Sequence, residues 1–179
     1  QVDDFSAANF DLQGGTFTDA TPTAHTFTVP GSFSVPDSGG SFNRYGAKDG
    51  EGYYLVRDVY DLQAMKGALD ADYKLVNDID ASATANWNSG AGFDPVGYDD
   101  ETHFYSGTFD GDSNTINGFY INRPTTSGVG LFGSAKGATI KDVGIVGGSV
   151  TGDWCVGSLV GWNSFSSIAN SYATGDVWG

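Results

Sequence analysis

The stretch SLVGWNSFSSIANSYATGDV (residues 158–177) decides the fold. Its apolar residues recur among Gly, Asn and Ser, and no charged residue occurs before Asp176. This spacing favours short strands joined by tight turns, not one apolar face of a helix. At the corners, Gly permits a positive φ, and side chains such as those of Asn163 and Asn170 can satisfy backbone groups.

The C-terminal half of the chain repeats itself. Three segments share an Ile at their second position: TINGFYI (115–121), TIKDVGI (139–145) and SIANSYA (167–173). Their Ile residues are 24 and 28 residues apart, and VGLFG (129–133) recurs as VGSLVG (156–161), which starts 27 residues later. A period of this size, without room for a ten-residue helix in each unit, predicts a parallel β-helix whose rungs close their core on one another.

The inward-facing apolar residues of these rungs are expected to form the core. They are Ile116, Ile121, Leu131, Ile140, Val143, Ile145, Leu159 and Ile168. One amphipathic helix is predicted from Asp58 to Leu69, with Asp58 as its N-cap and Asp61 in the capping-box position. This helix presents a single apolar face, and we expect it to cover the first rung.

The N-terminal segment has a different pattern. FDLQGGTF (10–17) and FSVPDSGGSF (33–42) both run from a Phe through a Gly-Gly turn to a second Phe, which indicates a weak β repeat. The turn-forming segment GAKDGEG (46–52) follows. We therefore divide the chain into an N-terminal β-rich extension (1–46) and a parallel β-helix (47–179).

Composition and charge exclude several classes of partner. The chain has 27 Gly, 22 acidic and 8 basic residues, and its net charge is −14. Such a surface repels nucleic acid and anionic lipid, and no stretch approaches the ~20 apolar residues that membrane insertion needs. Cys155 is the single cysteine, so no intrachain disulfide forms, and its apolar neighbours predict a small buried side chain.

The segment VGSLVGWNSFSSIANSYATGDV (156–177) resembles the GLUG-motif repeats of bacterial surface and secreted proteins, with Ser158 where the motif usually has a second Gly. The preceding segments (73–152) resemble the rungs of large exoproteins of the filamentous-haemagglutinin type, which are exported by two-partner secretion. The resemblance implies a right-handed β-helix at the bacterial cell surface or secreted from it, in adhesion or in a biofilm matrix. It implies no catalytic activity.

The sequence FDGDSNTINGFYI (109–121) begins like a calcium loop. Asp110, Asp112 and Asn114 occupy its first, third and fifth positions, but Thr115 replaces the required Gly and Ile121 replaces the bidentate Glu. An EF-hand is therefore excluded. A different Ca²⁺ site at these three residues stays open, and the favoured interpretation is an Asp-Gly turn between strands.

Three tryptophans lie in the last 26 residues: Trp154, Trp162 and Trp178. Exposed Trp side chains stack on sugars or anchor protein interfaces, so these residues are candidates for binding a host or neighbouring-cell glycan or protein. The alternative, that they pack over rung edges, stays open.

The remaining candidates for chemistry are weaker. The loop YDDETHF (98–104) gathers three acids and His103, and contiguous acids on a loop are usually solvated and not metal ligands. Parallel β-helices include polysaccharide lyases and glycosidases. A glycosidase needs a pair of carboxylates, but such pairs occur by chance among 22 acids, and the basic residues that a lyase would use to neutralise an acidic sugar do not cluster. We therefore expect no enzyme, and keep a polysaccharide-active one as the third alternative.

The sequence ends in SYATGDVWG (171–179), inside a repeat. A solenoid normally ends in a polar cap, so we expect the β-helix to be truncated at its C-terminus. The alternative is an open C-terminal rung that stacks head to tail on a second molecule. The sequence thus predicts an extracellular structural or adhesive module, with a self-assembling subunit of a matrix or biofilm fibre as the runner-up.

Overall fold

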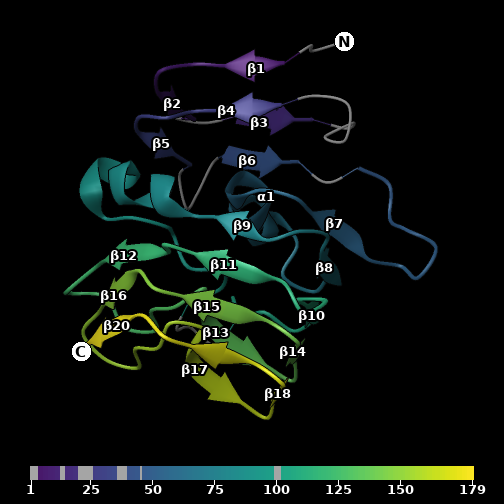
Figure 1. Cartoon of the computed structure of the whole chain (residues 1–179), viewed down its shortest axis with the longest axis vertical. Coiled ribbons are helices and arrows are strands. Elements are labelled where there is room, and N and C mark those ends of the chain that lie inside the picture. Colours follow the sequence, from purple (N-terminus) through teal and green to yellow (C-terminus); the bar gives the residue numbers. More distant parts are fainter. Residues whose placement is uncertain (1–3, 13–14, 20–25, 36–39, 45, 99–101) are drawn as a thin grey trace.

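The chain is mostly β structure with one short α helix, in a computed structural model that describes residues 4–12, 15–19, 26–35, 40–44, 46–98 and 102–179. The short strands lie one above another along the long axis of the molecule (Figure 1). Within the described residues all strands pair in parallel, and one antiparallel bridge joins Gly92 to Ile121. The prediction of a β-rich chain with one short helix is confirmed.

Four parallel sheets build the chain from residue 54 onward. The first contains, in spatial order, β18 (Ser167–Ala169), β14 (Thr139–Lys141), β10 (Thr108–Asp110), β8 (Tyr73–Leu75) and β7 (Tyr54–Val56). The second contains β19 (Tyr172–Ala173), β15 (Gly144–Val146), β11 (Thr115–Asn117) and β9 (Ile79–Asp80). The third contains β12 (Tyr120–Asn122), β16 (Ser149–Thr151) and β20 (Asp176–Trp178), and the fourth contains β13 (Phe132–Lys136) and β17 (Val160–Ser164).

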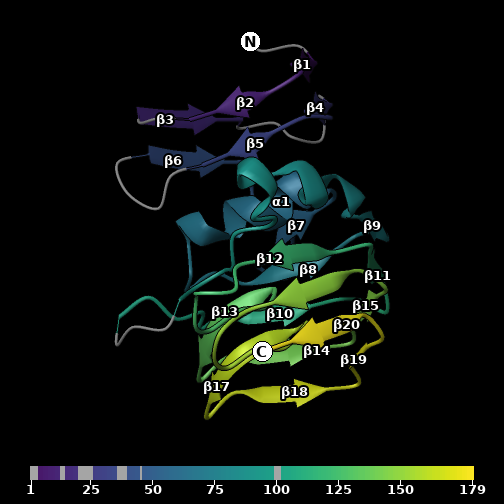
Figure 2. The same cartoon turned by 90° about the vertical axis from the view of Figure 1, so that its left-hand side faces the viewer.

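The chain visits these sheets in turn, and we call one such passage a layer. Ile140 lies opposite Ile168 of the next layer, so the predicted 28-residue spacing is confirmed. Val129 likewise lies opposite Val156, in agreement with the 27-residue spacing between VGLFG and VGSLVG. Figure 2 shows the layers edge-on, with the C-terminal layer farthest from the N-terminus.

The prediction that Ile116 and Ile140, 24 residues apart, occupy the same position in successive layers is wrong. Ile116 pairs with Ile79 and Ile145 in the second sheet, whereas Ile140 pairs with Phe109 in the first. The two segments are similar because each places an Ile inward, but they belong to different sides of the layers.

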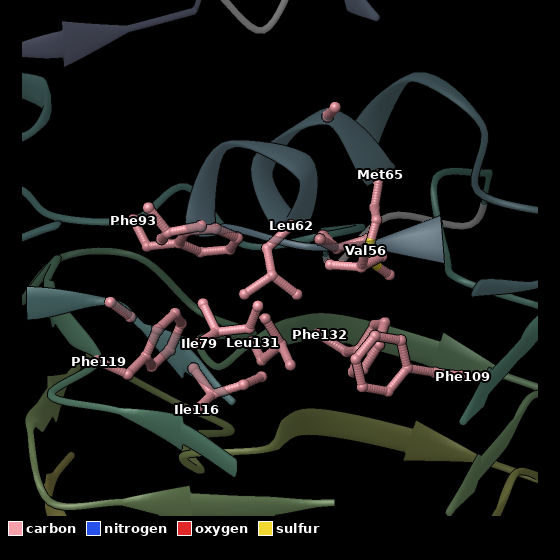
Figure 3. Packing of buried hydrophobic residues seen from close by; sticks show 14 of the residues in the cluster. Val56, Leu62, Met65, Ile79, Phe93, Phe109, Ile116, Phe119, Leu131 and Phe132 are labelled. Carbon is pink, nitrogen blue, oxygen red and sulfur yellow. The ribbon is translucent and has the colours of Figure 1, made fainter. Parts of the chain in front are cut away.

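The core is a column of apolar side chains between the sheets. Six of the eight predicted core residues are buried: Ile116, Ile121, Leu131, Ile140, Val143 and Ile145. The prediction is wrong for Leu159, which is half-buried, and for Ile168, which is exposed. Figure 3 shows the core beneath the helix, where Leu62 points toward Ile79 and Leu131.

The long connection between β9 and β10 contributes aromatic rings to this core. It contains the 3₁₀ helices η2 (Ser82–Asn86) and η3 (Asn88–Gly90), and it buries Trp87, Phe93 and Tyr105 completely. The sequence predicted a loop with its own aromatic residues here, and these rings instead fill the interior. Burial raises the pKa of the Tyr105 hydroxyl far above its usual range.

Two N-terminal layers are built around phenylalanine. Strands β1 (Phe5–Ser6), β2 (Phe10–Asp11) and β3 (Gly15–Thr18) pair in parallel with β4 (Phe27–Thr28), β5 (Phe33–Ser34) and β6 (Gly40–Asn43). The pairing places Phe5 on Phe27, Phe10 on Phe33 and Phe17 on Phe42, with stacked rings 4.7–5.3 Å apart. The weak repeat predicted for 10–17 and 33–42 therefore corresponds to two layers in register.

Helix α1 (Val59–Ala64) continues as the 3₁₀ helix η1 (Met65–Gly67), which is shorter than the predicted span to Leu69. The Asp58 carboxylate accepts hydrogen bonds from the N–H groups of Tyr60 and Asp61, so the predicted N-cap is confirmed. All six residues of α1 are buried, instead of one apolar face. The reason is that the helix lies between the phenylalanine layers and the sheets that follow (Figures 1 and 2).

A buried ionic cluster joins the phenylalanine layers to the helix. The Arg44 side chain is buried and lies within ion-pair distance of Asp19, Asp58 and Asp61, at 3.7, 2.8 and 3.3 Å. Its guanidinium also lies 4.9 Å from the centre of the Phe27 ring. Burial, and next the charge of Asp58, raise the pKa of Asp61 to about 7 despite the nearby arginine.

Candidate functional site

The three candidate tryptophans lie on or beside the last layer. Trp162 belongs to β17, Trp178 belongs to β20, and Trp154 lies in the turn between β16 and β17. Their exposed fractions are 37, 64 and 73%. Within the described residues no ring–ring contact joins any two of them, so the structure presents three separate aromatic surfaces on one layer.

The exposure of this layer follows from its strand pairing. Strands β17, β18, β19 and β20 each pair along one edge only in the described part of the chain. Ile168 and Val177 occupy the column positions of Ile140 and Val150, yet they are exposed because no further layer covers them there. Their exposure corrects the prediction that Ile168 is a core residue.

The sequence analysis missed Phe165 and Tyr172 as surface residues. Phe165 has a φ of 56° and is 95% exposed, at the turn between β17 and β18. Tyr172 is also exposed, and one edge of its ring lies against Gly144, where a Cβ would approach the ring to 2.5 Å. For Phe165, the signal available in the sequence was an aromatic residue where the preceding layer has Gly137, which also has a positive φ.

The residues proposed for calcium form the turn between β10 and β11. Asp110 Oδ1 accepts a hydrogen bond from the Asp112 N–H, and Asn114 Nδ2 donates to the Gly111 carbonyl. Asp110 Oδ2 lies 2.6 Å from Lys141 Nζ, and Asp112 Oδ2 lies 3.6 Å from Lys74 Nζ. Each carboxylate thus already has an ammonium partner that a cation would have to displace.

The electrostatics of this turn reflect those lysines. Burial raises the pKa of Asp110, but the hydrogen bond and charge of Lys141 outweigh it, so that the pKa lies below its usual value. The charge of Asp112 raises the pKa of Lys74, and the hydrogen bond to Asp110 raises that of Lys141. The Ca²⁺ site at Asp110, Asp112 and Asn114 stays a prediction.

The other candidate positions give no metal or catalytic cluster in the described residues. Asp99, Asp100 and Glu101 lie outside the described residues, and the His103 ring stacks on Tyr98 at 4.5 Å. No group of three or more His, Cys, Asp or Glu side chains could hold a metal ion among the residues that the structure describes. Cys155 is exposed, with a φ of 53°, so the expectation that it is buried is wrong.

The last layer matches a known family model. Residues 152–177 match the model described as "The GLUG motif". The chain contains a GLUG motif. This confirms the resemblance seen in 156–177, and it places β17 to β19 and most of β20 inside the motif.

Two curated proteins are similar to most of the chain. Halomucin of Haloquadratum walsbyi is 38% identical over 136 residues, which cover 72% of this chain and 2% of halomucin. A putative Gly-rich membrane protein of Evansella cellulosilytica is 30% identical over 126 residues, which cover 67% of this chain and 14% of that protein. The chain therefore spans a small part of the length of both relatives. No solved structure matches, and no helix in the described part is long and apolar enough to cross a bilayer.

Proposed function

We propose that residues 47–179 form a right-handed parallel β-helix and that residues 1–46 form a separate β-rich extension stacked on it. Parallel pairing at 27–31-residue intervals from β10 onward supports the first part. The change from phenylalanine columns to Ile and Val columns on either side of α1 supports the second. The handedness rests on the family resemblance.

The chain functions as a non-catalytic structural and adhesive module of a bacterial surface or secreted protein. The exposed Trp side chains of the last layer, which matches the GLUG motif, are the observation that carries this proposal, because exposed Trp side chains are typical anchors for glycans and proteins. The names of the relatives, a halomucin and a membrane protein, support a location at the cell surface or secreted from the cell. Two-partner secretion and a role in biofilm stay predictions from the resemblance.

The adhesive role is tested by binding of the purified chain to arrays of glycans and to intact cells. The variant Trp154→Ala/Trp162→Ala/Trp178→Ala is expected to lose most of the binding, while circular dichroism remains that of the unmodified chain. Val76→Ala is the matched control, because Val76 is an exposed apolar residue outside this layer. Equal binding by the triple variant would contradict the proposal.

Head-to-tail stacking into a fibre is the second candidate function. The single-edge pairing of the last-layer strands and the exposed Ile168 support it, because an uncovered strand edge pairs readily with another chain. Electron microscopy across a dilution series, with and without Ca²⁺, tests this candidate. Filaments that Ile168→Lys abolishes would support stacking, and separate particles at every concentration would contradict it. A polysaccharide-active enzyme stays the third alternative and rests on fold analogy alone.

A further inference from the structure

A cavity of about 380 Å³ lies beside the C-terminal end of the helical segment, and its lining residue Gly128 donates its N–H to the Trp154 carbonyl. Its wall combines charged, polar and ring side chains from three segments: Lys66, Asp94, Pro95, Tyr98, Arg123 and Thr126. The volume lies at the lower end of the ~300–1,000 Å³ typical of small-molecule sites. It suits a ligand of one or two rings.

Asp94 is held in this wall by contacts with three side chains. The buried Gln63 side chain donates to the Asp94 carbonyl at 2.8 Å and accepts from the Asp94 N–H at 3.0 Å. One carboxylate oxygen forms an ion pair with Lys66, and the other lies 3.1 Å from Arg123 Nη2. Arg123 Nε also donates to the Phe93 carbonyl, so both the carboxylate and the guanidinium are positioned before any ligand arrives.

This arrangement leaves hydrogen-bonding capacity at the carboxylate. A carboxylate has about four acceptor positions, and the two ion pairs occupy about two of them. Two hydroxyl groups on adjacent carbon atoms can each donate to such a carboxylate. The exposed Thr126 side chain adds a hydroxyl that can donate or accept at the rim of the cavity.

The rest of the wall is apolar. The ring of Tyr98 stacks on His103 with an interplanar angle of 16°, which fixes its orientation. Pro95 supplies a second rigid ring one residue after Asp94. A rigid aromatic surface beside a few polar groups is the usual composition of a site for a partly apolar, hydroxyl-rich ligand.

We propose that this cavity binds a neutral pyranose sugar, whose adjacent hydroxyls donate to Asp94 while its C–H face packs on Tyr98. A neutral ligand is favoured over an anionic one because Lys66 and Arg123 both pair with Asp94, in a chain of net charge −14. The inference rests on the proposed surface role, which would bring glycans to the cavity. It adds a site whose lining includes none of the three exposed Trp side chains.

The cluster also fastens the segment around Asp94 to the helix, so the test must separate ligand binding from folding. Isothermal titration calorimetry with methyl glycosides of glucose, galactose and mannose, and with methyl glucuronide, uses the whole chain and needs no assembly. We expect a single site for at least one neutral glycoside, with a Kd of about 0.1–10 mM. Asp94→Asn should weaken it roughly tenfold to hundredfold, as expected when a charge-assisted hydrogen bond becomes a neutral one.

Two further variants keep the test valid if Asp94→Asn fails to fold. Thr126→Val and Tyr98→Leu change only the rim and the ring surface, and each should weaken binding severalfold without lowering the thermal midpoint. Asp176→Asn is the matched control, because Asp176 is an exposed carboxylate in the last layer. It should bind like the unmodified chain.

Absence of binding to every neutral glycoside, or binding of the glucuronide alone, would overturn the inference. So would unchanged affinity in both Thr126→Val and Tyr98→Leu. The triple Trp variant distinguishes this site from the adhesive surface: it should lose binding to cells but retain the glycoside affinity. Loss of both activities in that variant would place the sugar site at the tryptophans and would also overturn the inference.

Discussion

The pair Ile140 and Ile168 offers a direct test of how stacking creates the core. Both residues occupy the same column of the first sheet, where they lie opposite each other in β14 and β18. Ile140 is fully buried, whereas Ile168 is 43% exposed. Substitution of Ile by Ala at these two positions therefore compares a site that a further layer covers with an equivalent site that no further layer covers in the described part of the chain.

The expected cost follows from burial. Ile140→Ala removes three carbon atoms from a closed core, which at about 0.8 kcal/mol per methylene corresponds to roughly 2.4 kcal/mol before any cavity remains. The cavity raises the loss to about 3–4 kcal/mol, within the measured range for Ile→Ala. For Ile168→Ala about half of the transfer energy is at stake and no closed cavity forms, so we expect about 1 kcal/mol.

Urea unfolding followed by circular dichroism measures both losses, with the slope of the transition as a check that the unfolded states are comparable. In thermal scans the two losses correspond to roughly 6–16 °C for Ile140→Ala and roughly 2–4 °C for Ile168→Ala. Losses that agree within about 0.5 kcal/mol would refute the reasoning, because equal costs require equal burial. A loss below about 1 kcal/mol at Ile140 would refute the strand register itself.

Three further outcomes test the junction and the corners of the layers. Arg44→Met should cost about 3–5 kcal/mol in urea unfolding, because it leaves the buried Asp61 carboxylate without its cation, and Asp61→Asn in the same chain should recover part of that loss. Because burial raises the pKa of Asp61 to about 7, the folded chain retains a proton that the unfolded chain, with a pKa of 3.8, releases. The Asp61 contribution to stability is therefore complete below about pH 4 and is lost as the pH rises to about 7. The urea midpoint of Asp61→Asn should decline less across this range than that of the unmodified chain. An identical decline would contradict the assignment. Gly137→Ala should cost about 1–2 kcal/mol, which is the penalty of a left-handed conformation for a residue with open space around its Cβ. Gly148→Ala should cost clearly more, because its Cβ would meet the Phe119 carbonyl oxygen at 2.0 Å. Equal thermal midpoints of the two variants would exclude this close approach.

The repeats in the sequence predicted which residues alternate inward, and six core positions follow from them. They did not predict the register between Ile116 and Ile140, because β11 in the second sheet and β14 in the first share the same Thr-Ile pair. Local similarity therefore aligned strands from two different sheets. The pair Ile140 and Ile168 and the pair Val129 and Val156 both identified the correct layer spacing.

Exposure of the last layer could not be predicted from the pattern for a physical reason. Inward orientation is a property of the strand, whereas burial also requires a neighbouring layer on each side. Ile168 has the inward position but lacks a second neighbour in the described chain, so it contributes to the surface with Val177. The same argument explains why α1, with layers on both sides, is buried all round although its sequence shows one apolar face.

The polar cavity is a feature that the layer spacing does not reveal. Lys66 lies in the 3₁₀ helix η1, Asp94 lies in the long connection before β10, and Arg123 follows β12. Asp94 and Arg123 lie beside the antiparallel bridge between Gly92 and Ile121, whereas the parallel strands β8 and β10, and β9 and β11, pair at intervals of 36 and 37 residues. The side chain of Gln63 fastens Asp94 to the helix. The contacts that build this wall therefore come from irregular segments, which is why the repeats in the sequence did not predict it.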